Sequence, residues 1–254
     1  MSARVREPLM PSSKVVVGLL GGSAAVSALL AIQILANRGR VSGGTFPLID
    51  LGQQLRPVLT PPPIGPIASL LALSTGIVWL VWQHRGHSDL WARGVPRLRY
   101  SPGWAVGWWF VPFASFFMPY KTTRELWWNA GRPADPAAPA EPKGRGLLRL
   151  WWAVFLASQL VGLGAFGPLF SGLVSSINGV ASTAPNQIPT VTFTTGSLRQ
   201  IAMWVALSCL VIAAAAGFAI WVVWTISARE DALSPAEASG PLPPRPDLGY
   251  LPPR

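Results

Sequence analysis

Four long stretches of the chain are apolar and carry few or no charged residues. An α-helix rises 1.5 Å per residue, so about 20 apolar residues cross a hydrocarbon core of about 30 Å. One stretch contains Arg149 near its start, where a long side chain can reach back to the interface. The pattern predicts an all-α membrane protein with four transmembrane helices, at about residues 15–37, 64–83, 147–170 and 200–227.

The first stretch is interpreted as a retained helix. A secretory signal has a core of about 7–15 apolar residues followed by a small-residue cleavage site. The stretch 15–37 is longer, and its end at Ile34-Leu35-Ala36 lacks the A-x-A pattern. A cleaved signal is the alternative.

A fifth apolar segment, Trp104–Met118, is too short to cross. Its 15 residues cover about 22 Å as a helix. Ser101-Pro102 is typical of a helix start, and Pro112 inside the segment kinks or ends a helix. We expect a Trp- and Pro-rich re-entrant or interfacial helical element over 102–118, packed on the other helices.

The distribution of Lys and Arg supports four crossings. With the N-terminus in the cytoplasm, four spans place sixteen of the twenty basic residues inside and four outside. Five spans give eight inside, or twelve with the opposite orientation. Basic residues gather on the cytoplasmic side of membrane proteins. The prediction is a multi-pass protein of the cytoplasmic membrane with both termini in the cytoplasm.

The remaining segments lie between or outside these spans. Residues 1–14 form a cytoplasmic N-terminus, and 15–228 form the helical membrane domain, with a Pro-rich linker over 133–146. An amphipathic interfacial helix is expected over 120–131, where Glu125 and Arg124 are candidates to pair with the basic loop Arg93–Arg99. Thr190–Thr195 is compatible with an extended segment. The tail 229–254 repeats Leu-Pro-Pro-Arg and is expected to be disordered.

Composition agrees with a membrane protein. The 254 residues are 50% hydrophobic and 12% charged, against about 25% charged residues in ordinary soluble domains. The net charge of +10 lies in juxtamembrane loops and fits anionic lipid head groups rather than nucleic acid. The Pro-rich tail offers a site for a protein partner, with a soluble spacer as the alternative.

The chain has thirteen Trp residues, and several of them lie at the ends of the predicted spans. Pairs of Trp occur where the second and last spans end and where the third begins. We interpret eight of them as an interfacial aromatic belt on the cytoplasmic side: Trp79, Trp82, Trp127, Trp128, Trp151, Trp152, Trp221 and Trp224.

The stretch LRYSPGWAVGWWFVPFASFFMPYKTTRELWW, residues 98–128, resembles a bacterial membrane protein family common in actinobacteria, the family of domain of unknown function 4328. The resemblance covers roughly 70–229 and implies architecture but no activity. An Asn expected after the central Pro is absent, with Ala114 and Ser115 in its place. The residues that match the family pattern are Tyr100, Ser101, Pro102, Trp104, Trp108, Trp109, Pro112, Pro119, Glu125 and Trp127.

Residues that commonly carry chemistry are sparse. The sequence has no phosphate-binding loop, H-E-x-x-H or G-x-S-x-G motif, and its single Cys excludes a disulfide framework. His84 and His87 are interpreted as solvated loop residues rather than metal ligands. Gln159 is expected to bond a neighbouring helix, with a polar path as the alternative. We expect no catalytic residue, metal or cofactor.

Small residues recur at four-residue spacing and predict close helix packing. The first span has Gly18 and Gly22, and the last has Ala213 and Gly217 with Cys209 on the same stripe. Internal packing and a homo-oligomer are equally compatible with this spacing. Cys209 is expected to be a buried small residue.

The sequence favours a non-enzymatic structural or partner-binding membrane module of unknown specific activity. The alternative is a transporter or channel for small molecules or ions, with the segment 102–119 lining the path as a broken helix. The lack of charged residues inside the spans argues against transport.

Overall fold

The computed structural model describes residues 10–40, 43–47, 64–131, 144–180 and 190–232. The chain divides into two compact units. Unit 1 comprises Met1–Val17, Gly76–Leu148 and Trp221–Arg254, and unit 2 comprises Gly18–Thr75 and Arg149–Ile220. The expected linker up to residue 143 and the expected tail from residue 233 lie outside the described residues. Residues 229–231, which were expected to belong to a disordered tail, are helical instead.

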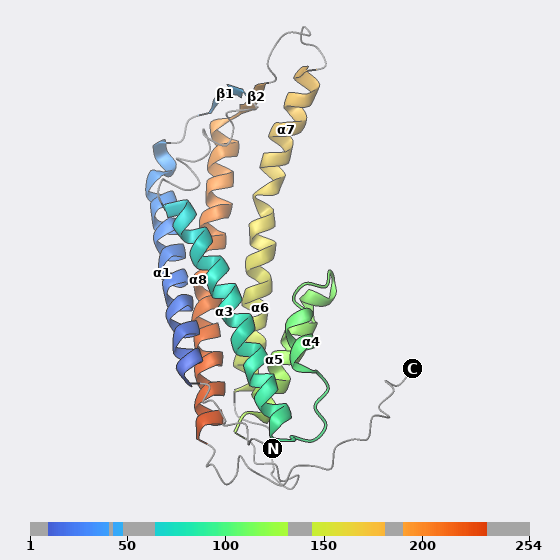
Figure 1. The fold of residues 1–254 in the computed structure, drawn as a ribbon. Helices are drawn as coiled ribbons and strands as arrows, with labels where there is room; N and C mark the ends of the chain where they lie inside the picture. Colours follow the sequence, from blue (N-terminus) through green and yellow to red (C-terminus); the bar gives the residue numbers. More distant parts are fainter. Residues whose placement is uncertain (1–9, 41–42, 48–63, 132–143, 181–189, 233–254) are drawn as a thin grey trace. The chain divides into compact units, whose positions relative to one another are not determined.

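Long helices dominate the described residues (Figure 1). Four helical stretches are long and apolar enough to span a membrane: Ser12–Arg40, Pro66–Ala92, Arg145–Gly172 and Thr195–Asp231. They confirm the predicted helical fold with four candidate spans. The main helices are α1 (Met10–Asn37), α3 (Ile64–Ala92), α6 (Arg145–Gly164) and α8 (Thr195–Asp231).

The largest differences from the expected helix boundaries are in the second and third stretches, while α1 begins five residues earlier than expected and α8 extends beyond both expected ends. Helix α3 continues to Ala92 rather than ending at residue 83, because no proline follows residue 66 until Pro96. The third stretch is broken, since α6 ends at Gly164 and α7 (Phe166–Val180) begins after a single residue. Glycines at 162, 164 and 167 and the following Pro168 weaken helical hydrogen bonding there.

Unit 2 contains a small-residue contact between α1 and α8. Ala31 and Ile34 of α1 pack with Ala202 and Ala206 of α8, and all four are buried. Cys209 is partly buried against this cluster, as its expected packing role requires. Close helix contact through small residues at four-residue spacing is therefore present, at Ala202 and Ala206.

The glycines singled out for packing have different surroundings. A Cβ at Gly22 would lie 3.6 Å from the Leu71 side chain, so this position faces α3. A Cβ at Gly18 or Gly217 would have no neighbour within 4 Å. Ala213 is half-buried. An oligomer contact through Gly18 and Gly217 stays a prediction.

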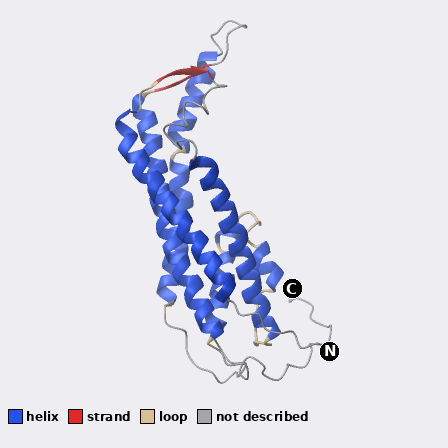
Figure 2. Ribbon diagram, turned by 60° about the vertical axis from the view of Figure 1, so that its left-hand side comes forward, coloured by secondary structure: helices blue, strands red, loops and turns tan. Residues whose placement is uncertain are grey.

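A two-stranded antiparallel sheet completes unit 2 (Figure 2). Strand β1 (Gly44–Pro47) pairs with β2 (Thr190–Phe193), with Gly44 opposite Phe193. Strand β2 lies within the segment 190–195 that was expected to be compatible with an extended conformation, whereas no strand was expected at the position of β1. Phe193 is buried and lies so close to Gly172 of α7 that a side chain at Gly172 would collide with its ring.

Large apolar side chains are exposed along the long helices. Leu29, Leu70, Leu160 and Phe170 are each 62–66% exposed. Soluble monomers rarely expose contiguous apolar surfaces of this kind. These helices therefore have the surface expected of lipid-facing transmembrane segments.

Helix α5 (Met118–Asn129) is followed, after its C-cap Ala130, by Gly131, whose backbone conformation favours glycine. Gly131 has φ +72°, and a Cβ there would lie 2.8 Å from the Arg229 carbonyl oxygen. We expect Gly131→Ala to lower the midpoint of thermal unfolding in detergent, because a left-handed residue with a Cβ costs about 1–2 kcal/mol before the collision is added. Gly146→Ala is the matched control, since a Cβ at Gly146 meets nothing within 4 Å. Equal midpoints for the two variants would contradict this expectation.

Candidate functional site: the Trp-rich block

The Trp-rich block, residues 98–128, begins with the expected helix start. The hydroxyl of Ser101 accepts a hydrogen bond from the Trp104 backbone N–H at 3.4 Å, and Pro102 opens helix α4 (Pro102–Gly107). The helix is shorter than the expected element and ends before Pro112. After it, Phe113 has φ 62°, a value that bulky residues rarely adopt. The chain turns back here, through the short helix η3 (Ala114–Phe116).

The two ends of the block meet within unit 1. The carboxylate of Glu125 on α5 accepts hydrogen bonds from the backbone N–H groups of Arg99 at 2.6 Å and Tyr100 at 3.2 Å. Glu125 was expected to meet the loop Arg93–Arg99 through an ion pair, but it does so through backbone N–H groups. Because these hydrogen bonds join the two ends of the block, the chain enters and leaves the block at the same place.

A buried glutamine of α3 joins the block to α5. The Gln83 side chain is fully buried, and its amide nitrogen donates to the hydroxyls of Thr122 at 3.0 Å and Thr123 at 3.2 Å. Its amide oxygen accepts from the indole N–H of Trp109 at 2.8 Å. Both threonine hydroxyls donate in turn to the carbonyl of Pro119, at 2.9 and 2.8 Å. Gln83 therefore joins α3 to Trp109 and to α5, and no pattern in the sequence indicated this role.

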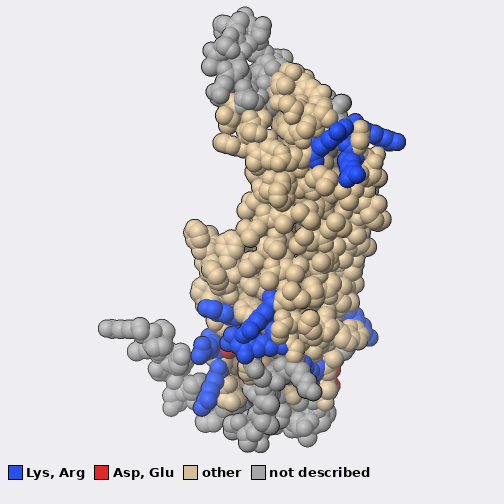
Figure 3. All heavy atoms as spheres, turned by 180° about the vertical axis from the view of Figure 1, so that it is seen from behind, with Lys and Arg blue, Asp and Glu red and all other residues tan. Residues whose placement is uncertain are grey.

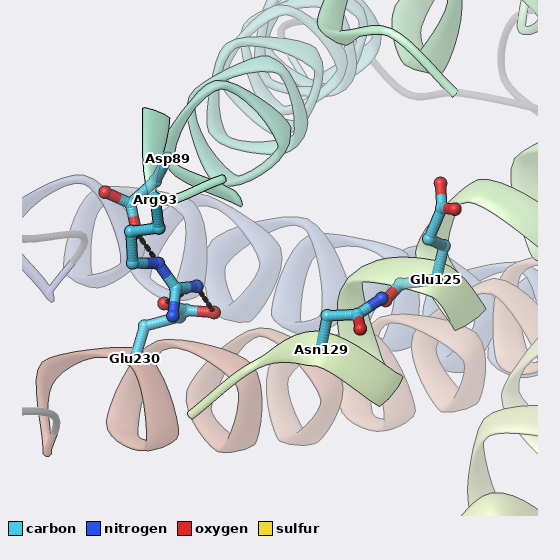
Figure 4. Close-up of polar contacts among 5 residues, drawn as sticks. All are labelled: Asp89, Arg93, Glu125, Asn129 and Glu230. Atoms are coloured by element: carbon cyan, nitrogen blue, oxygen red, sulfur yellow. Dashed lines mark hydrogen bonds and ion pairs between the residues drawn. The ribbon is translucent and has the colours of Figure 1, made fainter. Parts of the chain in front are cut away.

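An ion-pair cluster joins the C-terminal turns of α3 and α8 (Figure 4). The Arg93 guanidinium donates to both carboxylate oxygens of Glu230, at 2.8 and 2.6 Å, and its Nε lies 3.3 Å from Asp89. Side chains of Arg93 and Glu230 are 5% and 0% exposed. Paired carboxylate and guanidinium of this geometry satisfy each other without water. These residues were not singled out from sequence, because Arg93 and Glu230 are 137 residues apart.

Several Trp residues are buried in the protein, in contrast to the expected aromatic belt. Trp82 is fully buried and donates its indole N–H to the Ser227 hydroxyl at 3.2 Å. Trp127 is 1% exposed, with its ring centroid 5.0 Å from that of Trp221. Trp79, Trp151 and Trp152 are also buried, whereas Trp224 is half exposed. The expectation that all eight rings face an interface is wrong for the buried five, which pack as core.

The histidines lie on a helix, so their assignment to a solvated loop is wrong. Both belong to α3, and His84 is exposed. His87 is fully buried, with its Nδ1 3.0 Å from the carbonyl of Gln83 one turn earlier. Among the described residues no three His, Cys, Asp and Glu side chains form a group that could hold a metal ion.

Gln159 also differs from expectation. It is exposed, and its side-chain nitrogen donates to Ser158 of its own helix at 3.2 Å rather than to a neighbouring helix. Its outward position follows from the placement of Ser158, which is buried and bonds the carbonyl of Phe155 at 2.6 Å.

The other family-pattern residues take supporting positions in the block. Tyr100 accepts a hydrogen bond at its carbonyl from the Trp91 indole at 2.9 Å. The rings of Trp104 and Trp108 lie 4.8 Å apart. Pro112 accepts the N–H of Ala114 at its carbonyl, 2.7 Å away. The pattern therefore marks residues that shape the turn and join its ends.

The tip of the block is aromatic and exposed. Phe110, Phe113, Phe116 and Phe117 are 72%, 83%, 45% and 65% exposed. Four phenylalanines on one short turn form an apolar surface that a soluble protein would cover. The tip is therefore suited to lipid or to an apolar partner.

Lys and Arg side chains gather on parts of the face drawn in Figure 3, where little acidic surface is visible. The described part of unit 1 holds nine Lys and Arg against four Asp and Glu. Two of the four acids are paired with Arg93. Arg124 and Arg145 lie over the ring of Trp128, each 5.9 Å from its centroid. The accessible charge of unit 1 is therefore positive.

Burial raises the pKa of the Glu125 carboxyl, and the N–H groups of Arg99 and Tyr100 offset only part of that rise. A raised pKa in the folded state adds stability below the ordinary carboxyl pKa, and this stability is lost as the pH rises through the folded value. We expect Glu125→Gln, which cannot ionise, to lose less stability than the native chain across that window. The midpoint of thermal unfolding in detergent, measured for both proteins over a pH series, tests this expectation. A pH-independent difference between the two proteins would refute the assignment.

Comparisons with known proteins identify the family. A model of the family "Domain of unknown function (DUF4328)" matches residues 63–228, which include the block, the Gln83 contacts and the start of α5. Comparisons with curated proteins and with solved structures found no match. The matched segment covers more than half of the 254 residues, and the chain belongs to the DUF4328 family.

Proposed function

We propose that this chain is a structural or partner-binding module of the cytoplasmic membrane, in which unit 1 holds the Trp-rich block as a fixed platform. The observation that carries the proposal is the position of the charged residues. In the four long helices, every Asp, Glu, Lys and Arg lies within eight residues of a helix end: Lys14 in α1, Arg85 and Asp89 in α3, Arg145 and Arg149 in α6, and Arg199, Arg229, Glu230 and Asp231 in α8. Proton relays and many ion pathways use ionisable groups deeper in the spans.

The buried polar groups of unit 1 support a fixed platform. Gln83, Thr122 and Thr123 satisfy one another, and Arg93 is paired with Glu230. Fully satisfied buried networks make a structure rigid and specify one arrangement. Unit 1 then offers partners its positive surface and the exposed phenylalanines of the block.

The Pro-rich tail is the proposed site for a protein partner. Photo-crosslinking from a probe placed outside the tail, in the full chain and in a chain ending at Ala232, tests this. The truncation must keep Glu230, because removing it would leave Arg93 without its main partner. We expect a protein adduct that requires the tail and disappears when Pro243 and Pro244 are both replaced by Ala. Adducts to lipid alone would contradict a protein partner.

Transport along the segment 102–119 is the second candidate. The observation that favours it is the buried amide of Gln83, which contacts Trp109 beside the broken helix. Flux of a substrate panel into liposomes separates the two functions. Reproducible flux that Gln83→Leu or Pro112→Ala abolishes would support transport and overturn the structural proposal.

A further inference from the structure

An open crevice lies between α3 and α4 in unit 1. Its volume is about 390 Å³. Helix α3 lines it with Leu80, Val81, His84 and Arg85, and α4 lines it with Gly103 and Val106. None of these residues is among the side chains that Gln83 contacts.

The α3 lining changes from apolar to basic within one turn. Residues four apart share a helix face, so His84 follows Leu80 and Arg85 follows Val81. The exposed side chain of Ile77, 53% accessible, extends the same row beyond Val81. The crevice therefore has a basic end and an apolar track that leads away from it along the helix.

The basic end suits a phosphate group. A guanidinium binds phosphate oxygens through two parallel hydrogen bonds. The Ser88 hydroxyl lies 3.4 Å from Nδ1 of His84. When that hydroxyl donates, Nε2 of His84 carries the proton and can donate to an anion.

We propose that this crevice binds an anionic phospholipid, with its phosphate at Arg85 and His84 and an acyl chain along Val81 and Ile77. The inference rests on the proposed membrane function and gives it a specific lipid site. A free phosphate would use only the basic end, whereas a phospholipid uses both. The positive balance of unit 1 favours an anionic over a zwitterionic lipid.

Gly103 offers a way to fill the crevice without disturbing the backbone. A Cβ at Gly103 would meet nothing within 4 Å, so Gly103→Leu should fold and occupy space that the lipid needs. Gly146→Leu is its matched control, because Gly146 is equally open and lies outside the crevice. The variant Arg85→Gln tests the role of the positive charge at the basic end of the crevice. Its matched control is Lys121→Gln, which removes the charge of an exposed basic residue of α5 outside the crevice.

Native mass spectrometry of the full chain in detergent tests the site with phosphatidylglycerol and phosphatidylcholine. We expect preferential retention of phosphatidylglycerol, lowered about tenfold by Arg85→Gln and by Gly103→Leu but unchanged in both controls. Glycerol phosphate without acyl chains should not displace the lipid at matched concentration.

Three results would overturn the proposal: equal retention of the two lipids, wild-type retention by Arg85→Gln, or displacement by glycerol phosphate. Circular dichroism checks that each variant is folded. If Gly103→Leu does not fold, the lipid retention of Arg85→Gln alone tests the proposal. These results would leave the partner-binding proposal intact, because crosslinking and flux test that separately.

Discussion

Glu230→Ala is expected to lower the free energy of unfolding by about 3–5 kcal/mol, the cost of removing one partner of a buried ion pair. Glu230 is fully buried, and both its carboxylate oxygens accept from Arg93. Its removal takes from the guanidinium, itself 5% exposed, the two short hydrogen bonds to the carboxylate, while the contact to Asp89 is longer, at 3.3 Å. The midpoint of thermal unfolding in detergent, followed by circular dichroism, should fall accordingly.

The double variant Arg93→Met/Glu230→Met provides the control. It removes both charges and fills the space with apolar side chains, which is often neutral for a buried pair. We expect this double variant to be more stable than Glu230→Ala. In a double-mutant cycle with Arg93→Met and Glu230→Met, we expect the loss of stability in the double variant to be smaller than the sum of the two single losses, which is a favourable coupling. Additive losses would show that the pair does not stabilise unit 1 as a unit.

Trp127→Ala is expected to have a similar effect, about 3–5 kcal/mol, because it opens a large cavity in the core of unit 1. The Trp127 ring is 1% exposed and lies beside the Trp221 ring, and the Arg229 guanidinium is 4.3 Å from its centroid. A Cβ at Gly144 would lie 3.0 Å from the same ring, so the surroundings are closely packed.

Trp128→Ala is the matched control, since Trp128 is the next residue on α5 and is only half-buried. Its loss removes the ring under Arg124 and Arg145, contacts that at accessible sites are worth about 0.5–1 kcal/mol. Thermal unfolding should therefore separate the two variants clearly. Equal effects would mean that Trp127 is an interfacial ring, as the sequence alone suggested.

The parts of the fold that could be predicted are those with a local cause. Long uncharged runs predict the helical spans directly, because the length that a helix needs is fixed by the bilayer. Ser101-Pro102 predicts the start of α4, since a cap and a first-turn proline act within one turn. The amphipathic pattern of 120–131 predicts α5, whose buried face includes Thr123, Leu126 and Trp127.

The polar core of the site could not be predicted, because its contacts join residues far apart in the chain. Gln83 meets Thr122 across 39 residues, and Trp82 meets Ser227 across 145. A periodic pattern shows which face of a helix is apolar, but not which buried polar group will find a partner. The same reason explains the error over the Trp belt: an aromatic residue near a span end can face lipid or protein, and only the packing decides.

We propose that the Trp-rich block leaves and returns to one side of the membrane. The hydrogen bonds from Arg99 and Tyr100 to Glu125 are the structural basis for it. Labelling of single cysteines by a membrane-impermeant maleimide tests it most directly, in a chain carrying Cys209→Ala. Cysteines replace Ala92, an exposed residue before the block, and Lys121, an exposed residue of α5 that follows the segment 102–118; a third replaces Arg40, an exposed residue after α1. We expect Ala92→Cys and Lys121→Cys to react only after the cells are permeabilised, and Arg40→Cys to react in intact cells. Reaction of Ala92→Cys and Lys121→Cys from opposite sides would contradict it.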